Sequence, residues 1–169
     1  MTPFHQIHWR HYFKYAILSV ACYGICVFFY CRDDSFTETW LLFAGNGLFL
    51  TIVSASLFAF NKQRKQNAST VSMLAAGEIT TLLGIVLSCL LCFFILMIYV
   101  PGFPGTPHRS LHNEPVNIVR GKTNGLVFII FMSTIAGNFA AGSSATILFS
   151  FTLKGNQTKK TETSELSDL

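Results

Sequence analysis

The sequence predicts an all-α fold, an up-down bundle of four transmembrane helices in an integral membrane protein. Its composition is apolar, because 51% of the 169 residues are hydrophobic, 12% are charged and the mean hydropathy is +0.47. Globular chains average about a quarter charged residues. The apolar residues also lie in four blocks of spanning length. Short connections follow the first two blocks, and short connections make neighbouring helices antiparallel.

The four apolar runs define the expected spans. An apolar stretch of about 20 residues is long enough to cross a bilayer as a helix. The third run ends with 82–100, which carries no charged residue, and stops at Pro101. The second run opens at Trp40, a residue type that favours the membrane interface. Together the runs predict a transmembrane domain, 12–153, with spans at 12–30, 40–60, 71–100 and 125–153.

Polar segments flank and interrupt this domain. Residues 1–11 form the expected N-terminal segment. Residues 154–169 are charged, rich in Thr and Ser and devoid of aromatic residues, so we expect a disordered tail there. The long connection, 101–124, opens with closely spaced prolines and glycines, which disfavour regular helix.

The distribution of basic residues predicts the orientation in the membrane. In a chain with four spans, both termini and the second connection lie on one side. Lys and Arg are more frequent on the cytoplasmic side of membrane proteins. We therefore expect both termini to be cytoplasmic, because eight basic residues lie on their side (Arg10, Lys14, Lys62, Arg64, Lys65, Lys154, Lys159, Lys160) and four on the other (Arg32, Arg109, Arg120, Lys122).

Three polar side chains in the spans are candidate functional residues: Glu78, Asn46 and Asn138. An ionisable side chain at membrane depth needs a partner and often marks an ion or proton site. One interpretation is therefore a polar intramembrane seam that these residues share. The other places Glu78 near the interface, paired with a basic residue of the connection 61–70, and makes the two asparagines interhelical hydrogen-bonding residues.

Each span also carries small or polar residues at helical spacing, and helices in lipid pack through such faces. The expected packing faces are Tyr15, Ser19, Cys22 and Cys26 in the first span, Asn46 and Ser54 in the second, Glu78, Thr81, Ser88, Cys89 and Cys92 in the third, and Thr134, Asn138, Ala141, Gly142 and Ala145 in the fourth.

Cys89 and Cys92 form a Cys-x-x-Cys pair, the candidate thiols of a membrane oxidoreductase. Together with Cys22 and Cys26 they would supply the four thiolates of a metal site if the first and third helices met at matching depth. The pair lies inside an apolar run, however, where a thiol stays protonated and unreactive. We therefore expect no enzyme activity, and the redox pair remains an alternative.

The histidines have ligand-like spacing in two places. His5, His8 and His11 recur every third residue, and His108 and His112 lie in the long connection. Either set is a candidate for metal binding, and the first is equally consistent with an interfacial anchor. No motif for a phosphate, zinc or calcium site is present, so we expect no cofactor. Without a basic stripe interleaved with aromatic residues, we expect no nucleic-acid partner.

Three segments resemble small four-span membrane proteins of Gram-negative bacteria that are themselves uncharacterised. These are Asn67-Ala68-Ser69-Thr70, Gly77-Glu78-Ile79-Thr80-Thr81 and Gly84-Ile85-Val86-Leu87-Ser88-Cys89, which cover mainly the second and third spans. The resemblance implies an inner (plasma) membrane location and brings no activity.

The expected function is that of a non-catalytic structural or interaction subunit. Its partners would be the lipid bilayer and either a second copy of the chain or a larger membrane complex. The alternative is a small transporter or channel component that uses the polar seam of Glu78, Asn46 and Asn138.

Overall fold

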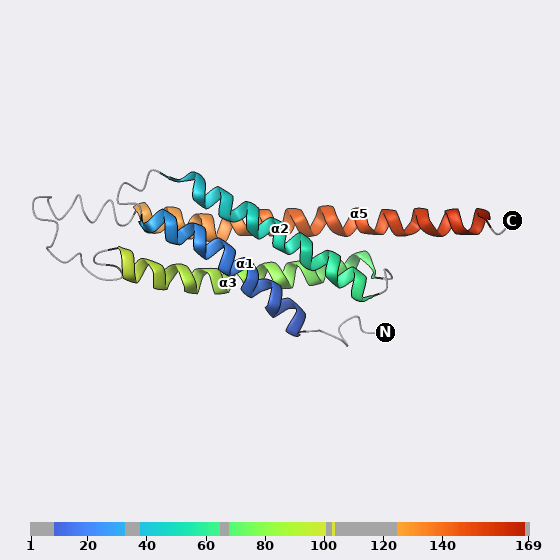
Figure 1. The fold of residues 1–169 in the computed structure, drawn as a ribbon, viewed down its shortest axis with the longest axis horizontal. Helices are drawn as coiled ribbons and strands as arrows, with labels where there is room; N and C mark the ends of the chain where they lie inside the picture. The colour runs from blue at the N-terminus through green and yellow to red at the C-terminus, as the bar shows by residue number, and fades with distance from the viewer. Residues whose placement is uncertain (1–8, 33–37, 65–67, 101–102, 104–124, 168–169) are drawn as a thin grey trace, which may run out of the picture.

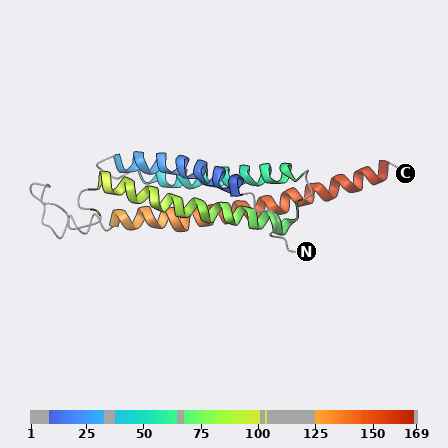
Figure 2. The ribbon, with the colours of Figure 1, turned by 90° about the horizontal axis from the view of Figure 1, so that it is seen from below.

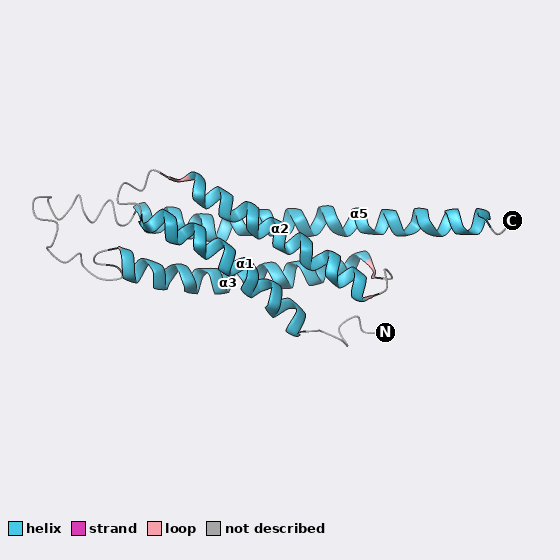
Figure 3. Cartoon of the chain, viewed as in Figure 1, coloured by secondary structure: helices cyan, strands magenta, loops and turns pink. Residues whose placement is uncertain are grey.

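The computed structural model describes residues 9–32, 38–64, 68–100, 103 and 125–167, with 156–167 as backbone. All elements in this part of the chain are helical (Figure 3). The helices are α1 (Trp9–Arg32), α2 (Trp40–Gln63), α3 (Thr70–Tyr99) and a fourth helix made of the segment 125–132, the π-helical turn η1 (Ser133–Gly137) and α5 (Asn138–Ser167).

Four helices are long and apolar enough to cross a membrane: Trp9–Arg32, Trp40–Gln63, Thr70–Tyr99 and Gly125–Gly155. They confirm the four runs that the sequence predicts. α1 begins three residues before the expected span and ends two residues after it, since no proline stands between Trp9 and Arg32. The structure therefore is an all-helical fold with four candidate membrane spans.

The four helices form two layers of two (Figure 2). α1 and α2 make one layer, and α3 and the fourth helix make the other. Across the layers, α1 packs against α3 and α2 packs against α5, so α2 and α3 lie on a diagonal although they follow one another in the chain. We call the end where α1 begins and α2 ends the terminal end, and the opposite end the loop end (Figure 1).

Local chemistry sets both ends of α3. The Ser69 hydroxyl caps the start by accepting a hydrogen bond from the Ser72 backbone N–H at 3.2 Å. At the other end Val100 is extended, with φ −107° and ψ 107°. The residue before a proline avoids the helical region because of steric contact with the proline ring, and Pro101 follows. The long apolar helix therefore stops where the sequence predicts.

The core contains three clusters of buried side chains along the bundle. One apolar cluster occupies the loop end, and two others lie toward the terminal end. The loop-end cluster is Tyr23, Val27, Tyr30, Cys31, Leu42, Cys92, Ile95, Leu96, Val100, Leu126 and Ile130; the others are Phe49, Val53, Ile85 and Ala145, and then Tyr12, Leu57, Phe60, Ala68, Met73 and Ala76.

α3 and α5 pack through two reciprocal glycine–threonine contacts. A Cβ added at Gly77 would overlap the Thr146 side chain, and one added at Gly142 would overlap Thr81. Each helix thus places a glycine and, four residues later, a threonine against the same pair on its antiparallel neighbour. The missing Cβ atoms allow the close approach on which packing in lipid depends.

The fourth helix continues past the expected end of the span. The composition predicts disorder from residue 154, whereas α5 runs without interruption to Ser167. Figures 1 and 2 show this part extending alone beyond the bundle. Apart from Gly155 the segment has no helix-breaking residue, and its Lys and Glu residues are good helix formers, so the helix of the span propagates into it. We call residues 154–167 the projecting segment.

Candidate functional site

A group of polar side chains from all four helices forms what we call the polar layer. Five of them contact one another: Tyr23, Asn46, Cys92, Ser133 and Thr134. The sixth, Asn138, lies beside them. The Tyr23 hydroxyl donates to Ser133 Oγ at 3.3 Å and lies 3.1 Å from Thr134 Oγ1. Thr134 Oγ1 itself donates to the Ile130 carbonyl at 2.7 Å, so toward Tyr23 it is an acceptor, and the single phenol proton is shared between the Ser133 and Thr134 oxygens. The Cys92 Sγ lies 3.4 Å from the same oxygen. The layer thus connects α1 and α3 to the fourth helix.

α2 joins the polar layer through Asn46. Its Nδ2 donates to Ser133 Oγ at 3.2 Å, while its Oδ1 has no hydrogen-bond partner among the described residues. The amide rests against Gly137, where an added Cβ would overlap it. Any other residue at position 137 would displace the Asn46 amide, so this glycine leaves the space in which the amide lies.

Asn138 is fully buried, and neither its Nδ2 nor its Oδ1 has a partner within the described part of the chain. It lies one helical turn from Thr134, which contacts Cys92 of α3, and one turn from Gly142, which contacts Thr81 of α3. Asn138 therefore faces the stretch of α3 between Thr81 and Cys92. A buried amide without a partner costs about 1–3 kcal/mol relative to a satisfied one, so this position is not optimised for stability.

Ser88 lies in that facing stretch of α3. It is fully buried, and its Oγ also lacks a hydrogen-bond partner among the described residues. Two adjacent helices thus bring unpaired donors and acceptors to the same level of the bundle. Such an arrangement is able to bind a small polar molecule or ion, because its hydrogen-bonding capacity is unused.

The π-helical turn η1 lies within this layer. A π-turn holds one more residue than an α-helical turn, and such turns are common at functional sites. Ser133 and Thr134 both belong to η1, and Asn138 follows it directly. The extra residue changes the direction of the preceding turn, so that two consecutive hydroxyls meet Tyr23 on one side and Asn46 on the other.

The polar layer lies on the loop-end side of the middle of the spanning helices. Tyr23 is nine residues from the loop end of α1, Cys92 seven from that of α3, and Thr134 nine from Gly125. At about 1.5 Å per residue these separations are about 10–14 Å. The apolar core of a bilayer is about 30 Å thick. A layer at this distance from the helix ends falls within the thickness of such a core when the helices span it.

Glu78 does not belong to this layer. Its Oε2 accepts a hydrogen bond from Ser143 Oγ at 3.2 Å. Ser143 is ten positions beyond Ser133 and five beyond Asn138 on the fourth helix, about 15 Å and about 8 Å along its axis toward the terminal end. Of the three residues of the expected seam, the structure brings Asn46 against the glycine that precedes Asn138, and it places the carboxylate of Glu78 at another level.

The two candidate thiols have different surroundings. Cys92 is buried against Thr134, whereas Cys89 is half-buried beside the cluster of Phe49 and Val53. All five cysteines are free thiols. Among the described residues, no three His, Cys, Asp or Glu side chains come close enough together to hold a metal ion. The site for four thiolates that Cys22 and Cys26 would complete is thus not formed.

Of the histidines, the structure describes His11. Its Nε2 lies 3.3 Å from the Ser56 carbonyl oxygen and its Nδ1 lies 3.3 Å from Gln63 Nε2. The ring is buried between α1 and α2 at the terminal end. His5, His8, His108 and His112 lie outside the described residues.

Sequence reasoning missed Tyr23, Ser133 and the π-turn. Tyr23 had a signal, since a phenol hydroxyl in the middle of an apolar span needs a hydrogen-bond partner. Ser133 had a weaker one, its position next to Thr134 on the expected packing face. The π-turn had none, because it depends on the packing of three helices around it.

The fold and the polar layer define a class: an all-helical protein with four helices long and apolar enough to cross a membrane, a candidate multi-pass membrane protein. No family model, curated protein or solved structure matches the chain. Its function therefore has to be inferred from its own residues.

Proposed function

We propose that this protein is a non-catalytic interaction subunit of a membrane assembly. The observation that carries the proposal is the projecting segment, which continues α5 to Ser167 and extends alone beyond the bundle (Figure 2). A helix that lacks packing contacts is marginal in water at this length. A partner surface along it, from a second copy of the chain or from another membrane protein, would supply the missing stabilisation.

The proposed location is the inner membrane of a bacterium, with both termini in the cytoplasm. The excess of basic residues at the terminal end supports this orientation. The projecting segment then lies in the cytoplasm, where it is accessible to a protein partner. No cofactor, nucleic acid or catalytic step is part of this proposal.

Native mass spectrometry of protein released gently from its own membrane tests the proposal. The full chain is compared with a chain ending at Gly155 and with Ser164→Pro, which breaks the projecting helix and keeps its length. We expect the full chain to carry a second copy or another protein at fixed stoichiometry, and both altered chains to lose it. Release of the full chain as a bare monomer would contradict the proposal.

A second candidate function, a small transporter or channel component, is favoured by the polar layer. Transport sites lie near the bilayer midplane, where helices depart from regular geometry. The buried Asn138 amide beside η1 matches both features. Glu78 contributes less than the sequence suggests, because it lies at another level.

Flux measurements in proteoliposomes test this second function. The probes are Na⁺, K⁺ and H⁺, each followed with an indicator inside the vesicles. If the layer conducts, Asn138→Leu removes the flux while Glu78→Gln retains it. Equal flux through the wild type and Asn138→Leu, or none through either, would rule out transport through this layer.

A further inference from the structure

The terminal end carries a cluster of exposed cations on the corner formed by the start of α1 and the end of α2. We call these residues the cationic corner: Arg10, Lys14, Lys62 and Arg64. In the part of the chain that the structure describes, none of them makes an ion pair with a carboxylate. Lys14 Nζ instead lies 5.9 Å from the centre of the Tyr15 ring, and the Arg64 guanidinium lies 5.4 Å from that of Phe60.

A chain of contacts makes the corner one surface. The His11 ring lies 4.8 Å from the Tyr15 ring and 6.1 Å from the Phe60 ring. The two rings under Lys14 and Arg64 are therefore connected through one buried histidine, although they belong to different helices. Hydrogen bonds between the two ring nitrogens of His11 and residues of α2 hold the two helices together there.

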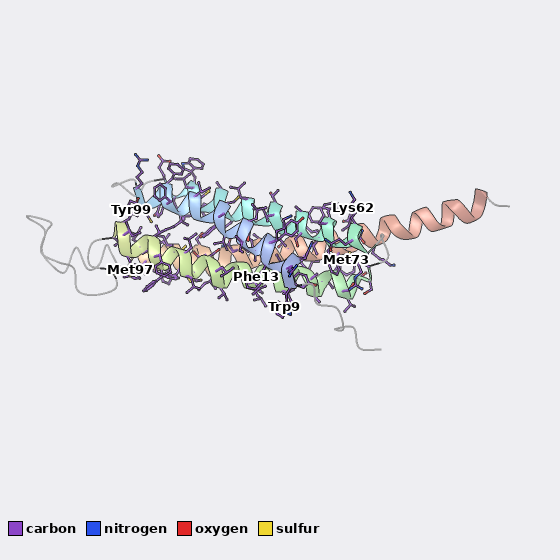
Figure 4. All side chains as sticks on the ribbon, turned by 60° about the horizontal axis from the view of Figure 1, so that its bottom comes forward. Trp9, Phe13, Lys62, Met73, Met97 and Tyr99 are labelled. Atoms are coloured by element: carbon purple, nitrogen blue, oxygen red, sulfur yellow. The ribbon has the colours of Figure 1, made fainter. Side chains whose placement is uncertain are left out.

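Apolar side chains border the cations along α1. Trp9 is 56% exposed beside Arg10, Phe13 is 44% exposed between Arg10 and Lys14, and Ile17 is 56% exposed one turn further toward the middle of the bundle. Figure 4 shows Trp9 and Phe13 along α1 and Lys62 at the end of α2, with Met97 and Tyr99 at the opposite end of the molecule. Cations beside exposed aromatic and apolar residues match the boundary between lipid headgroups and acyl chains.

We propose that the cationic corner binds the headgroup of an anionic phospholipid, with the acyl chains lying along Phe13 and Ile17 of α1. The cations complement the phosphate charge, and their rings hold Lys14 and Arg64 at the surface. A free anion would use the cations alone, whereas a phospholipid matches both parts of the surface. The opposite end of α1 has a single described cation, Arg32, so the site belongs to the terminal end.

Fluorescence quenching by brominated lipids tests this, because the chain has two tryptophans, Trp9 and Trp40, at opposite ends of the bundle. In Trp40→Phe, Trp9 reports the cationic corner; in Trp9→Phe, Trp40 reports the other end. Each variant protein is reconstituted into phosphatidylcholine vesicles. One set of vesicles contains brominated phosphatidylglycerol and the other contains brominated phosphatidylcholine at the same mole fraction.

We expect Trp9 to show a binding constant for phosphatidylglycerol at least about fivefold above that for phosphatidylcholine, the factor that about 1 kcal/mol from a single cation near the membrane surface gives. Trp40 should show no preference. The double variant Lys14→Gln with Arg64→Gln should lose the preference, while Lys14→Arg with Arg64→Lys and Arg32→Gln should keep it.

Equal quenching of Trp9 by both lipids, or a preference that survives the double variant, would overturn the proposal. Inorganic phosphate separates a lipid from a free anion. If phosphate abolishes the preference where chloride at the same ionic strength does not, the corner binds free anions and the lipid assignment is wrong.

Discussion

The hydroxyl oxygen of Tyr23 lies 3.1 Å from Oγ1 of Thr134, a contact between α1 and the one helix with which α1 otherwise scarcely packs. The phenol crosses the bundle and meets a π-helical turn. This contact ties α1 to the fourth helix, which lies diagonally across the bundle from it.

The Tyr23→Phe substitution should lower the free energy of unfolding by about 1 kcal/mol, within the range measured for hydrogen bonds between membrane helices. Unfolding by detergent titration measures it. Tyr99→Phe is the matched control, because the Tyr99 ring packs on Phe28 and its hydroxyl has no described hydrogen bond. Equal effects of the two substitutions would contradict the central role of the Tyr23 hydroxyl.

The Gly142→Ala substitution should destabilise the bundle by about 1–3 kcal/mol, because the new methyl group overlaps Thr81. Thr81→Ala in the same chain should restore part of the loss by making room. Gly47→Ala is the control, since no atom lies within 4 Å of its added Cβ, and it should be neutral or slightly stabilising. The same unfolding titration distinguishes these outcomes.

The two buried asparagines should respond in opposite directions to replacement by leucine, which has a similar volume. Asn138→Leu should raise the free energy of unfolding by about 1 kcal/mol or more, because it removes an amide without partners. Asn46→Leu should lower it, because it breaks the bond to Ser133 and its methyl groups press on Gly137. A loss of stability in Asn138→Leu would show that the amide is paired in the folded protein.

Deletion of Ala136 should be tolerated better than deletion of Ala140. The first removes the extra residue of the π-turn and leaves a regular α-helix with both halves close to their present register. Ala140 lies in regular α-helix, so its deletion rotates one half of the helix by about 100° relative to the other half. The yield of monodisperse protein after size-exclusion chromatography measures tolerance, and equal yields would contradict this description of η1.

The sequence was sufficient to predict the spans and most packing faces. Thr134, Asn138, Gly142 and Ala145 of the expected face on the fourth helix are buried, as are Thr81, Ser88 and Cys92 of α3. Small and polar residues at helical spacing mark the faces through which helices pack in lipid, so this pattern predicts the packing faces directly.

The spacing of residues along each helix did not predict which helices are neighbours in the bundle. α2 and α3 are consecutive, yet they lie on a diagonal, and a connection of this length spans either distance. The separation of Glu78 from Asn46 follows from that arrangement and from the antiparallel register of α3 against α5. Both depend on contacts between residues far apart in sequence, which periodicity does not report.

Disulfide crosslinking in the membrane tests most directly the central claim, that α2 meets the fourth helix at the polar layer. In a chain whose native cysteines are replaced by alanine, Asn46→Cys with Gly137→Cys places two thiols where the amide now contacts the glycine. The control pair is Gly47→Cys with Gly137→Cys, rotated about 100° away on α2. We expect rapid oxidation of the first pair and none of the second. Equal rates for the two pairs, or oxidation of the control pair alone, would contradict the arrangement.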